Sequence, residues 1–138
     1  MSKIPALIGL LLLYLTGASL QAAKAPAIDT EYTADKIAED VYVIHGPLET
    51  PNPINQGFMN NPGIIITDAG VVVVDPGGSV QSGEMVISHI EKLTDKPVVA
   101  VFDSHVHGDH WLGNQAFMEK YPEVKIYAHH EMIKAVKL

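Results

Sequence analysis

Two short apolar runs, residues 71–74 and 98–102, constrain the fold more than any other feature of this sequence. The first consists of four valines and the second reads Val-Val-Ala-Val-Phe, with no polar residue in either. β-Branched and aromatic residues favour strands, and a strand without polar alternation is typical of one buried on both faces. An amphipathic helical pattern over residues 79–93 separates the two runs. A strand, a helix and a second strand in this order predict a βαβ unit, and therefore an α/β fold with parallel strands.

Further elements are predicted on both sides of this unit. Two apolar segments joined by Asp68-Ala69-Gly70 indicate a hairpin, with the glycine supplying a positive φ. A segment rich in Pro, Asn and Gly, residues 48–58, predicts a surface loop. The remaining expected elements are a strand over 41–45, a helix over 110–120 that includes Leu112, a strand over 124–128 and a helix over 131–138.

The first 25 residues are typical of a secretory signal peptide. Lys3 precedes an apolar run over residues 6–15, and small residues follow at Ala22 and Ala25, between which we expect cleavage. The apolar run is about half the roughly twenty residues that a membrane-spanning helix needs, so we expect no permanent membrane anchor. We therefore expect export, to a periplasm, with residues 26–36 as a leader and 37–138 as the folded domain.

Composition excludes several classes of function. The chain has nine lysines and no arginine against sixteen acidic residues, and its formal net charge of −7 argues against nucleic acid as a partner. The absence of cysteine excludes disulfides, thiolate zinc sites and a cysteine nucleophile. A metal site in this chain must therefore use histidine and carboxylate ligands.

Four side chains that bind metals follow the second apolar run within six positions: His105, His107, Asp109 and His110. Ligands collect at the carboxyl ends of strands in α/β sheets, where this segment is expected. Residues two apart in an extended segment point to the same side, so His105 and His107 are suited to bind one metal. Gly108 lets the backbone turn, so Asp109 and His110 suit a second, adjacent metal. Nitrogen and carboxylate ligands match zinc best, while manganese and non-haem iron also accept them.

The His105-x-His107-x-Asp109-His110 motif after a valine-rich strand, with Asp75-Pro76-Gly77 ending an earlier strand, resembles the metallo-β-lactamase superfamily over residues 37–138. The segment 107–114 is similar to that of its bacterial exported hydrolases. The fold implied by this resemblance is an αβ/βα sandwich of two similar halves with a two-metal site between them. This chain would supply the N-terminal half.

The resemblance also implies a role for each residue of the motif. His105 and His107 would bind the first zinc ion, Asp109 and His110 the second, and Asp75 would support the metal-binding loop from behind. The implied reaction is hydrolysis of a small molecule, in which a metal-bound hydroxide oriented by Asp109 attacks a lactam, a thioester or another ester. The loop 48–58 occupies the place of a substrate-flanking loop, but the substrate and the oligomeric state stay undetermined.

Members of the superfamily need a further histidine, a bridging aspartate and a last histidine from their C-terminal half. After His110 this chain offers only His129 and His130, which we do not assign as ligands. We therefore expect a chain truncated at its C-terminus and inactive by itself. Two alternatives stay open: a non-haem iron oxidoreductase on the same fold, and a non-catalytic metal-binding or partner-binding module that ends at Leu138.

Overall fold

The computed structural model describes residues 25–28 and 31–136. Six strands form one sheet in the order β1-β2-β3-β4-β5-β6. The strands are β1 (Ala34–Ala38), β2 (Val41–Ile44), β3 (Gly63–Thr67), β4 (Gly70–Val74), β5 (Val98–Asp103) and β6 (Lys125–Ala128). The helices are α1 (Val80–Leu93), α2 (Asn114–Lys120) and α3 (His130–Val136), with a single 3-10 turn, η1 (Gly108–His110). The expected signal peptide lies outside the described residues but for its last position.

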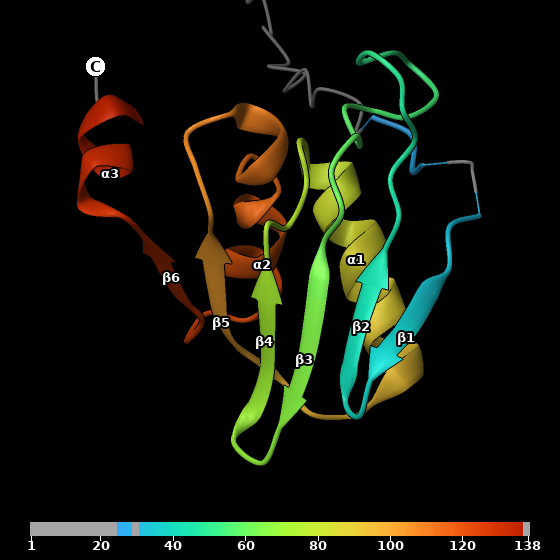
Figure 1. The fold of residues 1–138 in the computed structure, drawn as a ribbon, viewed down its shortest axis with the longest axis vertical. Helices are drawn as coiled ribbons and strands as arrows, with labels where there is room; N and C mark the ends of the chain where they lie inside the picture. Colours follow the sequence, from blue (N-terminus) through green and yellow to red (C-terminus); the bar gives the residue numbers. More distant parts are fainter. Residues whose placement is uncertain (1–24, 29–30, 137–138) are drawn as a thin grey trace, which may run out of the picture.

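The sheet combines an antiparallel half with a parallel half. Strands β1 to β4 pair antiparallel in sequence order, whereas β4, β5 and β6 are parallel neighbours. Figure 1 shows α1 and α2 on one face of this sheet, with the carboxyl ends of β2, β4 and β5 at its upper edge. The predicted hairpin and βαβ unit are therefore confirmed, and the fold is α/β. No helix in the described ranges is long and apolar enough to cross a membrane.

Helix α1 begins directly after its N-cap residue, Ser79. Ser79 Oγ accepts a hydrogen bond from the backbone N–H of Ser82, and Ser82 Oγ accepts one from the backbone N–H of Ser79. This reciprocal pair satisfies two N–H groups that the first turn of a helix leaves free. One turn further on, a Cβ at Gly83 would lie 2.5 Å from the backbone oxygen of Gly113. Glycine at this position therefore lets α1 approach the start of α2 closely.

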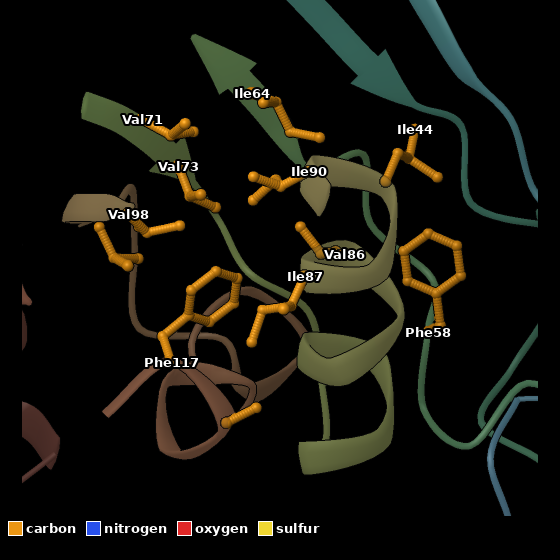
Figure 2. Close-up of a cluster of buried hydrophobic side chains, with 12 residues drawn as sticks. Ile44, Phe58, Ile64, Val71, Val73, Val86, Ile87, Ile90, Val98 and Phe117 are labelled. Carbon is orange, nitrogen blue, oxygen red and sulfur yellow. The ribbon is translucent and has the colours of Figure 1, made fainter. Parts of the chain in front are cut away.

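The hydrophobic core lies between the sheet and helices α1 and α2, as Figure 2 shows. Val71 and Val73 of β4 face Val86 and Ile90 of α1, and all four are fully buried. The remaining members of the cluster come from β2, β3, β5, α1, α2 and the loop after β2: Ile44, Phe58, Ile64, Ile87, Val98, Val101, Ala116 and Phe117.

The opposite face of the sheet corrects one expectation. Strand β4 was expected to be buried on both faces, but Val72 and Val74 are only half-buried. On the same face, Phe102 of β5 and Tyr127 of β6 stack with ring centroids 4.9 Å apart while each stays 45% exposed. The reason is that α1 and α2 cover the other face, and none of the described elements covers this one.

Two element boundaries also differ from those expected. The expected leader contains the start of an edge strand, since β1 begins at Ala34 and pairs with β2. Sequence reasoning missed this strand because its side chains are largely exposed and show no apolar alternation. The helix expected over 110–120 begins only at Asn114, and Leu112 is exposed. The preceding residues form the tighter turn η1, which carries the end of the histidine motif.

Replacing a core residue of α2 tests this packing. Phe117 is fully buried, so Phe117→Ala should lower the free energy of unfolding by about 3–5 kcal/mol through lost burial and the resulting cavity. The neighbouring Met118 is about half exposed, so Met118→Ala should change it by about 0.5 kcal/mol or less. Urea unfolding of both variants measures the difference, and equal effects would contradict the assigned core.

Candidate active site

Asp75, the residue after β4, is the centre of a hydrogen-bond network at the upper edge of the sheet. Its Oδ1 accepts the backbone N–H of Ser104 at 2.7 Å, and its Oδ2 lies 2.7 Å from Ser104 Oγ and 2.9 Å from His110 Nδ1. Burial by itself raises the pKa of Asp75, but the two hydrogen bonds from Ser104 and the contact with His110 outweigh burial and lower this pKa. The carboxylate is therefore held ionised beneath the histidine motif.

The backbone of Asp75 adopts a conformation that few residues other than glycine tolerate. Its φ is +54°, in the left-handed region, where a residue with a side chain is strained by about 1–3 kcal/mol. Two contacts hold it there: its N–H donates to Phe102 O at 2.9 Å, and its carbonyl accepts the side-chain amide of Asn60 at 2.8 Å. This conformation belongs to the turn in which the carboxylate receives Ser104 and His110.

The histidines of the motif lie close together. His105 Nε2 is 3.1 Å from His107 Nδ1, and the rings of His105 and His110 have centroids 4.0 Å apart. The expectation that His105 and His107 point to the same side agrees with this geometry. Two nitrogen ligands of one tetrahedral zinc ion lie about 3.3 Å apart, given Zn–N distances near 2.05 Å. The facing nitrogens of His105 and His107 have nearly this separation.

Asp109 and His110 form the second pair. His110 Nε2 lies 3.3 Å from Asp109 Oδ2, while His110 Nδ1 faces the Asp75 carboxylate. A carboxylate accepts hydrogen bonds only, so the N–H of a neutral His110 ring belongs on Nδ1, next to Asp75. The lone pair of Nε2 then faces a carboxylate oxygen, an arrangement that a metal ion or a second ring proton between the two atoms satisfies.

No three His, Asp or Glu side chains within residues 25–28 and 31–136 are arranged as one group that holds a metal ion. The motif instead forms two pairs of donors. Each pair has one ligand fewer than the three protein ligands typical of catalytic zinc. His129 and His130, which follow β6, are exposed; their rings lie 4.3 Å apart and His130 contacts Glu131.

The loop 48–58 borders this site through backbone contacts. A Cβ at Gly78 would lie 2.3 Å from the carbonyl oxygen of Gly57 and 2.9 Å from Asp109 Cα. Glycine at this position therefore allows the loop, the turn after β4 and the histidine motif to meet. The loop itself is tied by Asn52 and Asn55, whose side chains accept hydrogen bonds from four of its backbone N–H groups.

A second buried carboxylate, Asp103, ends β5 directly before the motif. Burial raises its pKa to about 6; the hydrogen bond from Asn114 Nδ2 opposes this, and the negative charge of Asp75 adds to it. Asp103 also lines an apolar cavity of about 190 Å³ with Trp111, Ile126 and other residues. Ionised Asp103 is therefore costly in this fold.

Comparisons with known proteins identify the family. The sequence profile of the metallo-beta-lactamase superfamily matches residues 55–136, which is more than half of the chain. The chain belongs to this superfamily.

Two curated relatives are enzymes by name. The chain is 37% identical to a linear primary-alkylsulfatase of Pseudomonas sp. (strain ATCC 19151) over 71 residues, which are 49% of this chain and 13% of that protein. It is 40% identical to a hydroxyacylglutathione hydrolase of Nostoc sp. (strain PCC 7120) over 55 residues, 40% of this chain and 20% of that protein. The chain thus spans a fifth or less of the length of these relatives.

A solved structure shows the same fold. The metallo beta-lactamase from Hirschia baltica superposes with a TM-score of 0.61 and 18% identity, over 78% of this chain and 48% of that one. The predicted fold, one half of a metallo-β-lactamase sandwich, is confirmed by this likeness.

Sequence reasoning singled out the motif and Asp75 but missed the polar residues that contact Asp75 and Asp103. Ser104 and Asn60 contact Asp75, and Asn114 contacts Asp103. The position of Ser104, immediately before the first histidine of the motif, was a usable signal. Asn60 and Asn114 gave none, because their partners lie 15 and 11 residues away along the chain.

The raised pKa of Asp103 predicts a pH-dependent cost. The folded-state pKa of Asp103, about 6, exceeds its unfolded value of 3.8. The contribution of Asp103 to the free energy of unfolding is therefore fully present below about pH 4 and is lost as the pH rises through 6. In metal-free protein, Asp103→Asn should therefore raise the free energy of unfolding at pH 7.5 by about 1–3 kcal/mol relative to wild type, and by little at pH 4. Urea unfolding at both pH values measures this, and a difference independent of pH would contradict it.

Proposed function

We propose that this chain provides the metal-binding half of an exported, zinc-dependent hydrolase that cleaves ester bonds in small molecules. The observation that carries the proposal is the pair of donor sets at one edge of the sheet. His105 faces His107, Asp109 faces His110, and Asp75 holds both sets from behind. Superfamily membership and the names of the two matched relatives support hydrolysis.

In this proposal His105 and His107 bind one zinc ion, and Asp109 and His110 bind a second. Zinc, when bound, polarises the substrate and lowers the pKa of water so that water attacks at neutral pH. The Asp75 carboxylate orients His110 through Nδ1, leaving Nε2 for the metal. Asp109 would also orient the attacking water, by accepting a hydrogen bond from it. Further ligands are needed to complete the coordination of both metal ions.

Sulfate esters with an alkyl chain are the first substrate class we propose. The support is the similarity to the alkylsulfatase over 71 residues and the composition of the loop 48–58. Two apolar residues of this loop, Leu48 and Ile54, are exposed, and the loop packs against Gly78 beside Asp109. Exposed apolar side chains on this loop suit contact with the alkyl chain of such a substrate. Thioesters and β-lactams are the comparison classes.

The test uses the complete gene product that contains this chain. We expect it to contain zinc by mass spectrometry and to release sulfate from a medium-chain alkyl sulfate faster than it opens a β-lactam. His105→Gln and His107→Gln should each lower zinc content and reduce kcat/KM by more than about 100-fold, beyond the loss typical of groups that only orient ligands. His89→Gln is the matched control, because His89 lies on α1 outside the motif.

Iron in place of zinc, with no hydrolysis of any of the three substrate classes, would contradict the proposal and favour the oxidoreductase alternative. Full activity in both motif variants would also contradict it, because it would show that the motif does not hold the metal.

Export is a separate proposal that rests on residues 1–25. We expect the N-terminus of the mature protein, recovered from the periplasmic fraction and sequenced, to begin between residues 23 and 26. An intact Met1 on cytoplasmic protein would contradict it.

A further inference from the structure

Ser104 connects the Asp75 carboxylate with the first histidine of the motif. Its Oγ lies 2.7 Å from Asp75 Oδ2 and 2.9 Å from His105 Nδ1, and its backbone N–H donates to Asp75 Oδ1 at 2.7 Å. The side chain therefore has a carboxylate on one side and an imidazole nitrogen on the other. Nearby, His105 Nε2 faces His107 Nδ1.

Counting protons assigns the direction of these hydrogen bonds. A serine hydroxyl has one proton to donate, and a carboxylate accepts only. Two hydrogen bonds from Ser104 and one from His110 end on the carboxylate oxygens of Asp75. The Ser104 proton therefore belongs to the bond with Asp75. The Ser104 oxygen then acts as acceptor toward His105, so the ring proton of a neutral His105 belongs on Nδ1.

We propose that Ser104 is a positioning residue that fixes His105 in the tautomer with the proton on Nδ1 and the lone pair on Nε2. The Nε2 atom is the one that faces His107. The consequence for zinc rests on the proposed function: with its ring proton already on Nδ1, His105 can bind zinc through Nε2 without first moving that proton.

The same carboxylate reaches the second donor pair by a different route. His110 Nδ1 contacts Asp75 directly, whereas His105 contacts it only through the Ser104 hydroxyl. Removing that hydroxyl should therefore free His105 and leave His110 in place. His110 is thus an internal control within the same molecule.

The test measures tautomers in metal-free, nitrogen-15-labelled gene product at about pH 8, by long-range proton–nitrogen NMR correlations, with His105→Gln used to assign the signals. We expect the Nδ1–H form at His105 in wild type and in Ser104→Thr, which keeps the hydroxyl. In Ser104→Ala and Ser104→Val we expect the Nε2–H form to appear at His105 while His110 keeps its proton on Nδ1. Threonine and valine have nearly the same shape, so this pair isolates the hydroxyl.

Zinc titration against a competing chelator is the second readout. Ser104→Ala and Ser104→Val should weaken the zinc affinity of the His105–His107 pair by about 10-fold or more, and Ser104→Thr should restore it. A merely structural role of Ser104 would not move the His105 tautomer while sparing that of His110.

Two results would overturn the inference. The first is an Nε2–H form at His105 in the wild-type protein, a measurement that does not depend on the folding of any variant. The second is an unchanged His105 tautomer in both Ser104→Ala and Ser104→Val. A wild-type protein with the expected tautomer and the expected response to substitution, but without zinc or hydrolysis, would defeat the proposed function and still support the role of Ser104.

Discussion

The structure around the candidate site depends on one carboxylate. Asp75 receives Ser104 twice and His110 once, over sequence separations of 29 and 35 residues. These bonds tie the end of β4 to the segment that follows β5, and they orient two of the four residues of the motif. Without this carboxylate, His110 would lose its direct partner and His105 its partner through Ser104, and neither ring would have a defined proton position. The left-handed backbone of Asp75 is strained, and contacts from Asn60 and Phe102 offset that strain.

Close backbone approach is the second constraint, and glycines permit it. Gly113 N–H donates to Gly77 O at 2.8 Å, and a Cβ at Gly113 would lie 2.5 Å from the oxygen of Pro76. The start of α2 therefore packs directly against the turn that contains Asp75. Gly78 likewise allows close approach of the loop 48–58 and the backbone of Asp109. Three segments far apart in sequence, the loop 48–58, the turn at 76–78 and residues 109–113, meet at this edge because no side chain separates their backbones.

The two faces of the sheet differ in how they are covered. One face packs on α1 and α2 and contains the fully buried valines of β4. The other carries half-buried valines and the exposed stacked pair of Phe102 and Tyr127, in the part of the chain that the structure describes. A valine run alone therefore predicts a strand reliably, but it does not reveal how many of its faces are covered. That depends on which other elements pack against it.

The sequence by itself determined the local elements and the chemistry available to them. The valine runs, the Asp68-Ala69-Gly70 turn and the helical pattern over residues 79–93 depend on residues close together in the chain, so β-propensity, turn geometry and hydrophobic periodicity suffice to predict them. The spacing of His105, His107, Asp109 and His110 likewise indicated two pairs of donors. Only the tertiary structure decided which atoms of these residues face one another, and that Ser104 and Asn60 contact Asp75 while Asn114 contacts Asp103. The physical reason is that a hydrogen bond depends on distance and direction in space, whereas partners 11 to 35 residues apart leave no periodic signal in the chain.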